Sequence, residues 1–253
     1  MFAVPCDVAA CANCRLGQVS PGTAACQSVS TANIEYGFYD DVTVFERLAD
    51  AGRDWAVYLD GVAQVWVYPR LWLDGTERFH GMARFLRDVA DGTLPAYSFI
   101  EPNHGYGAGE GNSQHPGNNT IKGDSFLAGE QLMAQIYDAL VANPGLFAKT
   151  LFLVTYDEHG GFFDHCPPHR VASPDRFLDR SGFDFSWSGV RVPAVAVSPL
   201  IPAGTVDGTF YDHATIAATV RRQFAPAADP LTRRDAEAND LLDHLPLLSL
   251  IHI

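Results

Sequence analysis

The chain has few basic residues and no long apolar run. Its 253 residues contain 17 Lys and Arg against 30 Asp and Glu, which gives a formal net charge of -13 at pH 7. Such a chain offers no basic surface for neutralising phosphates, which argues against a general nucleic-acid-binding function. No apolar stretch approaches the roughly 20 residues that a transmembrane helix needs. The first residues also lack the charged and apolar regions of a secretory signal peptide.

Length and composition are typical of a globular protein with one large core, and we place no internal domain boundary. Apolar segments of strand length alternate with amphipathic helical patterns. Strands are predicted over 54–59, 94–100, 150–155 and 192–198, and helices over 43–51, 78–91 and 125–141 and from Asp212, a candidate N-cap. This alternation predicts an α/β fold with a largely parallel sheet sandwiched by helices.

Cysteine is concentrated at the N-terminus. Four of the five cysteines lie within residues 1–33, a segment without periodicity that we interpret as irregular: Cys6, Cys11, Cys14 and Cys26. The two-residue spacing of Cys11 and Cys14 is compatible with a zinc knuckle, and disulfides in an exported protein are the alternative. Cys166 stands apart, and we interpret it as a packed thiol.

The most informative segment runs from Tyr156 to His165 and reads YDEHGGFFDH. Asp157 and Glu158, which we call the acidic pair, directly follow the apolar strand predicted over 150–155. We expect this strand to be buried and central, and open α/β sheets bind ligands outside the carboxyl ends of their strands. Burying so many ionisable groups without a metal or an anion is costly, so the segment predicts a metal-assisted site. Oxygen ligands suit Mg, Ca or Mn, nearby histidines also admit Zn or Fe, and a solvated loop is the alternative.

Three histidines are candidate catalytic residues. His165 follows Asp164, which could hold the ring in one tautomer or simply cap a turn. His213 opens a predicted helix, where backbone N–H groups favour a bound anion, although a surface histidine is the alternative. His115 lies in a long polar loop and could contact a phosphate or belong to a lid. His104 has a similar position and a weaker case.

These segments resemble the phosphoesterase family that contains bacterial phospholipases C, plant non-specific phospholipases C and related acid phosphatases. The resemblance covers residues 33–240 and runs through 43–48, 94–102, 113–116, 156–165, 189–193 and 212–215. It implies an alkaline-phosphatase-like core. It also implies hydrolysis of phosphate mono- or diesters by a hydroxyl nucleophile and a bound divalent metal. The substrate would be a phospholipid or a small ester.

The resemblance also implies roles for individual residues. Asp157 and Glu158 would be metal ligands, and His115 and His213 would lie at the phosphate site, with His165 a weaker candidate. The metal would polarise a phosphoryl oxygen, and the histidines would neutralise charge or protonate the leaving oxygen. Secretion or a periplasmic location is expected for the same reason.

The N-terminal part departs from this family. Members carry a Glu-Asn metal-ligand motif and a Ser or Thr nucleophile before the region that matches Thr43, and neither occurs here. We therefore expect an irregular segment over 1–33, a partial phosphoesterase domain over 34–245 and a tail over 246–253 that could be non-native. Such a chain should have an exposed sheet edge and little or no turnover. The alternatives are a non-catalytic metal- or phosphate-binding protein derived from such an enzyme and an unrelated metallohydrolase with a water nucleophile.

Overall fold

The computed structural model describes residues 41–73, 76–105, 111–116, 126–175, 178 and 182–245. The N-terminal cysteines and the tail over 246–253 lie outside the described residues, so their interpretations stay predictions. Within the described part, none of the helices combines the length and the hydropathy of a membrane span.

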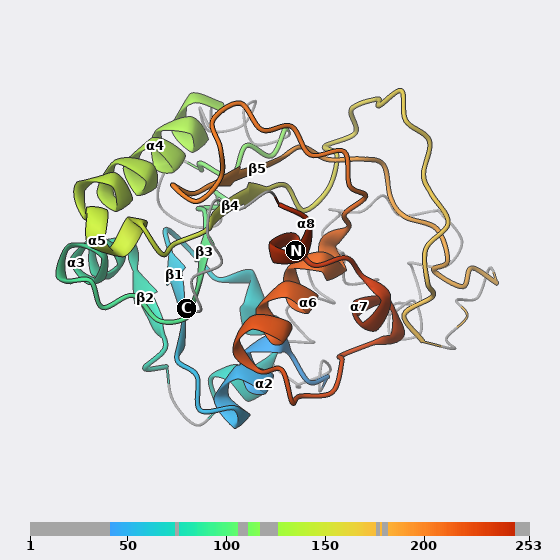
Figure 1. Cartoon of the computed structure of the whole chain (residues 1–253), viewed down its shortest axis with the longest axis horizontal. Coiled ribbons are helices and arrows are strands. Elements are labelled where there is room, and N and C mark those ends of the chain that lie inside the picture. The colour runs from blue at the N-terminus through green and yellow to red at the C-terminus, as the bar shows by residue number, and fades with distance from the viewer. Residues whose placement is uncertain are drawn as a thin grey trace.

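A parallel three-stranded sheet forms the centre of the described fold (Figure 1). β1 (Trp55–Leu59) lies between β2 (Phe79–Gly81) and β3 (Tyr97–Glu101), and both neighbours run parallel to it. The helices are α2 (Val44–Asp50), η2 (Gln64–Val67), η3 (Pro69–Leu71), α3 (Met82–Asp91), α4 (Phe126–Ala142), α5 (Pro144–Phe147), α6 (His213–Phe224), α7 (Arg233–Glu237) and α8 (Leu241–His244).

Alternate side chains of β1 enter two hydrophobic cores on opposite faces of this sheet. Ala56 and Tyr58 pack with residues of α3, α4 and α5, whereas Trp55 and Val57 pack with residues of α2, η3 and α6. Side chains of a strand alternate between its two faces, so helices must cover both faces of a strand that is apolar throughout. The predicted α/β fold is confirmed.

Capping groups in the sequence set several helix ends. The Glu46 carboxylate accepts the backbone N–H of Thr43 at 2.7 Å at the start of α2. Gly92 ends α3 in the left-handed conformation, with φ 69°. The Asp212 carboxylate accepts two backbone N–H groups at the start of α6. These ends agree with the sequence predictions because each is decided by local chemistry.

Two predictions about the sheet are wrong. The helix predicted from Arg78 begins only at Met82, because Phe79–Gly81 pairs with β1 as a strand. The strand before the acidic pair, β4 (Phe152–Thr155), is not central: within the described residues it pairs only with β5 (Ala194–Val197), in the antiparallel direction. All four residues of β4 are half-buried, so it is not the buried strand that its apolar sequence predicts.

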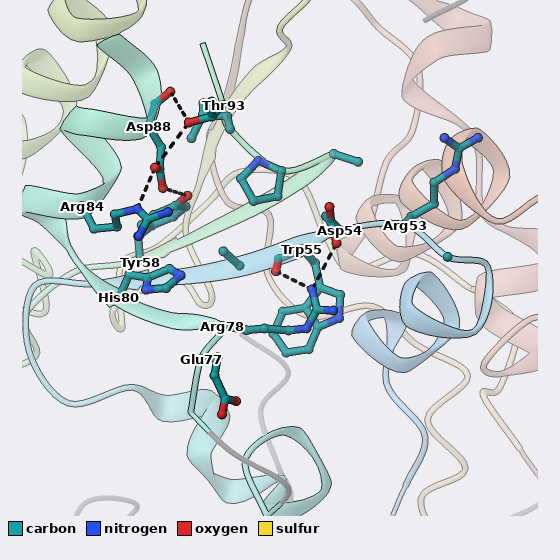
Figure 2. Close-up of a pocket in the computed structure, with 15 residues that line it drawn as sticks. Arg53, Asp54, Trp55, Tyr58, Glu77, Arg78, His80, Arg84, Asp88 and Thr93 are labelled. Carbon is teal, nitrogen blue, oxygen red and sulfur yellow. Dashed lines mark hydrogen bonds and ion pairs between the residues drawn. The ribbon is translucent and has the colours of Figure 1, made fainter. Parts of the chain in front are cut away.

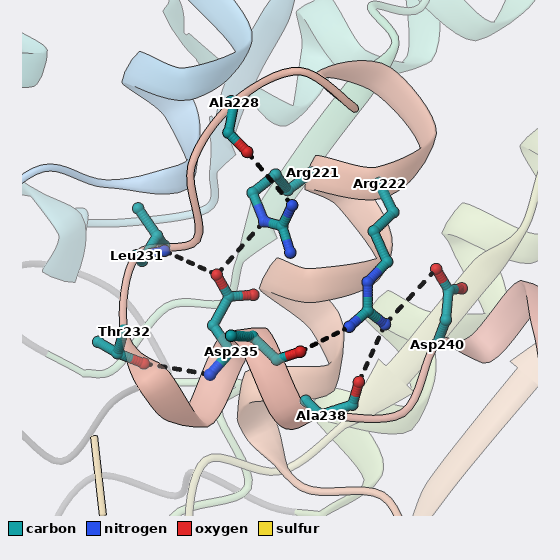
Figure 3. Close-up of polar contacts among 9 residues, drawn as sticks. Arg221, Arg222, Ala228, Leu231, Thr232, Asp235, Ala238 and Asp240 are labelled. Carbon is teal, nitrogen blue, oxygen red and sulfur yellow. Dashed lines mark hydrogen bonds and ion pairs between the residues drawn. The ribbon is translucent and has the colours of Figure 1, made fainter. Parts of the chain in front are cut away.

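The segment after α6 folds back onto that helix through two arginines (Figure 3). The Arg221 Nε and Asp235 Oδ2 atoms lie 3.4 Å apart, and only 8% and 3% of these side chains are exposed. Arg222 donates to the carbonyl oxygens of Ala238 and Ala236 at 2.9 and 3.1 Å. These contacts fix α6, whose first residue is one of the predicted catalytic histidines.

Candidate functional site

The candidate site lies where the carboxyl ends of β3 and β4 come together. β3 leads into His104 and β4 leads into Asp157. The His104 imidazole interacts electrostatically with Asp157 and with His115, so three segments that are distant in sequence meet here. Burial, reinforced by His115, lowers the pKa of His104, and Asp157 acts in the opposite direction.

Glu101 closes the end of β3 as a structural carboxylate. Glu101 is 5% exposed, and its two carboxylate oxygens accept the N–H groups of Gln64 at 2.5 Å and Val65 at 3.1 Å. Burial raises its pKa to about 7, although both hydrogen bonds act to lower it. Glu101 therefore holds η2 against the edge of the sheet that carries the site.

Asn112 ties together the segments that follow β1 and β3. Its side chain donates to Asp60 at 2.6 Å and accepts the N–H of Asn103 at 2.7 Å. Its own N–H donates to the Asn103 carbonyl oxygen at 2.9 Å. A Cβ atom at Gly61 would lie 3.0 Å from the Asn103 side chain, which is closer than ordinary van der Waals contact. The turn that leads into His104 is therefore held by a defined polar network.

Gln114 joins the loop of His115 to the strand end that carries the acidic pair. Gln114 is 8% exposed, and its backbone has a left-handed φ of 61°. The amide nitrogen donates to the Phe126 carbonyl oxygen at 2.8 Å, and the amide oxygen accepts the hydroxyl of Tyr156. Because Tyr156 directly precedes the acidic pair, Gln114 links the two predicted parts of the site.

His213 reaches the same strand end from α6. Its Nε2 atom lies 2.8 Å from the carbonyl oxygen of Tyr156. A carbonyl oxygen only accepts hydrogen bonds, so Nε2 carries the proton of the neutral ring. The lone pair of the neutral ring is then on Nδ1, which can take up a proton or bind a metal.

The acidic pair uses one oxygen of each carboxylate inside the motif. Asp157 Oδ1 accepts the N–H of Glu158 at 3.0 Å, and Glu158 Oε2 accepts the N–H of Gly160 at 2.7 Å. Gly160 has φ 62°, and a Cβ atom there would lie 2.9 Å from Pro116 in the loop of His115. The other oxygen of each carboxylate makes no hydrogen bond to the described residues. Oxygen donors beside imidazoles fit a divalent metal ion.

His165 has no such connection. Its side chain is 80% exposed, and no hydrogen bond or ion pair joins it to the other candidate residues within the described part of the chain. Asp164 lies 3.8 Å from its ring, which is too far for a hydrogen bond. Instead Asp164 accepts the Cys166 N–H at 2.7 Å, as a turn cap does, and pairs with Arg191 at 3.1 Å. A catalytic role for His165 stays a prediction.

A second arrangement of possible metal ligands involves these same residues. Asp164, His165 and the half-buried Cys166 offer ligand atoms within 4.8 Å of one another, the one such group of three in the described ranges. The backbone N–H of Cys166 and the Arg191 guanidinium hold the pKa of Asp164 below its usual range. A guanidinium already bound to the carboxylate competes with a cation, which makes this the poorer metal site.

Residues 10–225 match the Phosphoesterase family. The chain belongs to the phosphoesterase family. Non-specific phospholipase C5 of Arabidopsis thaliana is 34% identical over 211 residues, which cover 78% of this chain and 39% of that protein. Non-specific phospholipase C6 is 31% identical over 227 residues, covering 82% and 42%. Hemolytic phospholipase C of Pseudomonas aeruginosa is 28% identical over 253 residues, covering 81% and 33%.

The family match covers the candidate site residues but only part of the length of the relatives. It contains His104, His115, the acidic pair and His213, whereas Asp235 lies beyond its end. The chain spans only about two fifths of the length of the plant relatives it matches. The resemblance read from the sequence is confirmed, and the activity of a whole phosphoesterase is a separate question.

A pocket at the opposite edge of the sheet does not belong to this site (Figure 2). It has a volume of about 680 Å³ and surrounds the amino ends of β1, β2 and β3. Its charged groups largely pair with one another: Asp88 accepts the Tyr58 hydroxyl at 2.8 Å and Arg84 Nε at 2.7 Å. None of the predicted site residues lines it. Because α/β sheets bind ligands at the carboxyl ends of their strands, this pocket is not where the sheet topology leads us to expect the candidate site.

Sequence reasoning missed part of this site. His104 comes shortly after a predicted strand, as Asp157 does, and this position is the signal in the sequence for its place at the candidate site. Gln114 offered no comparable signal, because its importance depends on contacts with Phe126 and Tyr156 that only the fold creates.

Proposed function

We propose that this protein hydrolyses phosphate esters at the carboxyl edge formed by β3 and β4, with a divalent metal ion. The observation that carries the proposal is the meeting of His104, His115, the acidic pair and His213 from four separate segments. The relatives are named phospholipases C, which favours a phospholipid over a small monoester as substrate. Export from the cytoplasm belongs to the same proposal.

Asp157 and Glu158 would hold the metal. Each has one carboxylate oxygen that makes no hydrogen bond to the described residues, so each can supply a ligand without losing a contact. A bound divalent ion polarises a phosphoryl oxygen and activates a hydroxyl or water. Its oxygen donors favour Mg, Ca or Mn, while the nearby histidines also admit Zn or Fe.

The histidines would handle protons and charge. His213 holds its Nε2 proton against the Tyr156 carbonyl, so its Nδ1 atom would take a proton and later return it to the leaving oxygen. His115 and His104 would donate ring N–H groups to the phosphoryl oxygens and so stabilise the negative charge there.

Binding without turnover is the second candidate. One observation favours it: among the described residues, the acidic pair is not part of a group of three ligand atoms within 4.8 Å. A metal shell with few ligands would bind an ion and a phosphate without supplying everything that hydrolysis requires.

Hydrolysis of 4-nitrophenyl phosphate and bis(4-nitrophenyl) phosphate with added Mn²⁺, Ca²⁺ or Zn²⁺ tests the proposal. We expect metal-dependent turnover that Asp157→Ala abolishes and His213→Ala reduces by about 10²- to 10⁴-fold. Asp138→Ala, which removes an exposed carboxylate of α4, is the matched control. Metal-dependent phosphate binding without turnover would favour the second candidate. A protein that shows neither phosphate binding nor turnover would overturn both candidate functions.

A further inference from the structure

We propose that Gln114 and Tyr156 form a positioning pair that fixes His213 and the acidic pair relative to each other. Neither residue belongs to the groups assigned above to metal or proton chemistry. The consequence for catalysis rests on the proposed function, whereas the consequence for the state of the His213 ring does not.

The backbone of Gln114 adopts a conformation that needs an explanation. A φ of 61° is rare for a residue with a Cβ atom, and such residues persist only where surrounding contacts hold them. A Cβ atom at Gly129 of α4 would lie 2.4 Å from the Gln114 Cγ atom, so the glycine makes room for this side chain. Both features bring the Gln114 amide into a buried position at the site.

Both ends of the Gln114 amide are used, and in complementary ways. The nitrogen, which can only donate, faces the Phe126 carbonyl oxygen at 2.8 Å. The oxygen, which can only accept, faces the Tyr156 hydroxyl. This arrangement has one satisfied orientation, because a flipped amide would oppose two acceptors at Phe126. Gln114 therefore connects the start of α4 to the strand end before the acidic pair.

Tyr156 connects Gln114 both to His213 and to the acidic pair. Its carbonyl oxygen accepts the Nε2 proton of His213 at 2.8 Å. Its own peptide then continues into Asp157. A rotation of the Tyr156 backbone would break the contact with His213 and turn the acidic pair away together. The hydroxyl contact with Gln114 opposes that rotation, so one side chain restrains the whole group.

The test compares Tyr156→Phe and Gln114→Gly with the parent protein. Tyr156→Phe removes only the hydroxyl, and the ring and carbonyl remain. Gln114→Gly removes the side-chain amide, and glycine adopts the left-handed backbone conformation without strain. A loss of thermal stability in this variant would therefore not come from backbone strain. Tyr137→Phe is the matched control, because this tyrosine is 43% exposed and its hydroxyl makes no hydrogen bond to the residues that the structure describes.

Long-range ¹H–¹⁵N spectra of the histidine rings report which nitrogen of His213 carries the proton. We expect the Nε2–H form in the parent and in Tyr137→Phe, and a mixture of both forms in Tyr156→Phe and Gln114→Gly. Mn²⁺ affinity, and hydrolysis of bis(4-nitrophenyl) phosphate where the parent shows it, should fall about 10- to 100-fold in both variants. The double variant should lose no more Mn²⁺ affinity or activity than the poorer single variant, because both changes break the same hydrogen bond between Gln114 and Tyr156.

An unchanged His213 tautomer together with parental Mn²⁺ affinity in Tyr156→Phe would overturn the positioning pair. Additive losses in the double variant would do the same. If Tyr156→Phe loses its fold, Gln114→Gly carries the decision through the same two readouts. A parent that hydrolyses no ester counts against the proposed function alone, since the tautomer still decides the pairing of Gln114 with Tyr156.

Discussion

Glu101 gives the fold a pH dependence that a single substitution should remove. Its buried carboxyl has a pKa raised from 4.5 to about 7, chiefly by burial. The native state therefore holds a proton that the unfolded chain releases at lower pH. The stability contributed by this proton is complete below pH 4.5, is lost as the pH rises toward 7 and changes little above that. The effect has the opposite sign to that of an ordinary ion-paired carboxylate.

The magnitude follows from the two pKa values. Each pKa unit corresponds to about 1.4 kcal/mol, and between pH 5.5 and 8 the parent should lose about 2 kcal/mol of stability through Glu101 alone. Glu101→Gln removes the titration. The glutamine oxygen can accept the N–H of one of Gln64 and Val65, but the glutamine NH2 group then faces the N–H of the other. This loss of one hydrogen bond costs about 1–3 kcal/mol at every pH. That cost cancels when the two pH values are compared.

Urea denaturation followed by the fluorescence of the four tryptophans measures this difference. The free energy of unfolding of the parent minus that of Glu101→Gln should fall by about 2 kcal/mol from pH 5.5 to pH 8. Other titrating groups are common to both proteins and drop out. A difference that stays constant with pH would mean that the pKa of Glu101 is not raised, because the two hydrogen bonds offset or outweigh burial.

Two further predictions concern α6. Asp235→Ala leaves the buried Arg221 without its counter-ion and should cost about 3–5 kcal/mol in urea denaturation. Glu237→Ala breaks the exposed pair with Arg233 and should cost less than about 1 kcal/mol, so equal losses would contradict the account. Asp212→Ala removes the N-cap of α6 and should lower the free energy of unfolding by about 1 kcal/mol, and an unchanged value would argue against the cap.

Features that depend on local chemistry were predictable from the sequence. The start of α2 after Thr43, the end of α3 before Gly92 and the start of α6 after Asp212 agree with the predicted helix ranges, because each end depends on residues that are neighbours in the chain. The logic of strand ends also held, since a polar residue after an apolar strand arrives at the carboxyl edge. Both Asp157 and His104 illustrate it.

Features that depend on distant partners were not predictable. Phe79–Gly81 became a strand because β1 was available to pair with it, against its own helical pattern. The apolar sequence of β4 indicated a strand but not its partner or its depth. The left-handed Gln114 is stabilised by contacts with Gly129, Phe126 and Tyr156 that no periodicity reveals.

Anomalous diffraction from crystals soaked with Mn²⁺ tests whether the acidic pair binds a metal, because it locates the ion without requiring turnover. We expect a manganese peak beside the carboxylates of Asp157 and Glu158, and no peak there in Asp157→Ala. A peak confined to Asp164, His165 and Cys166 would contradict it and would assign metal binding to the other group of ligand atoms.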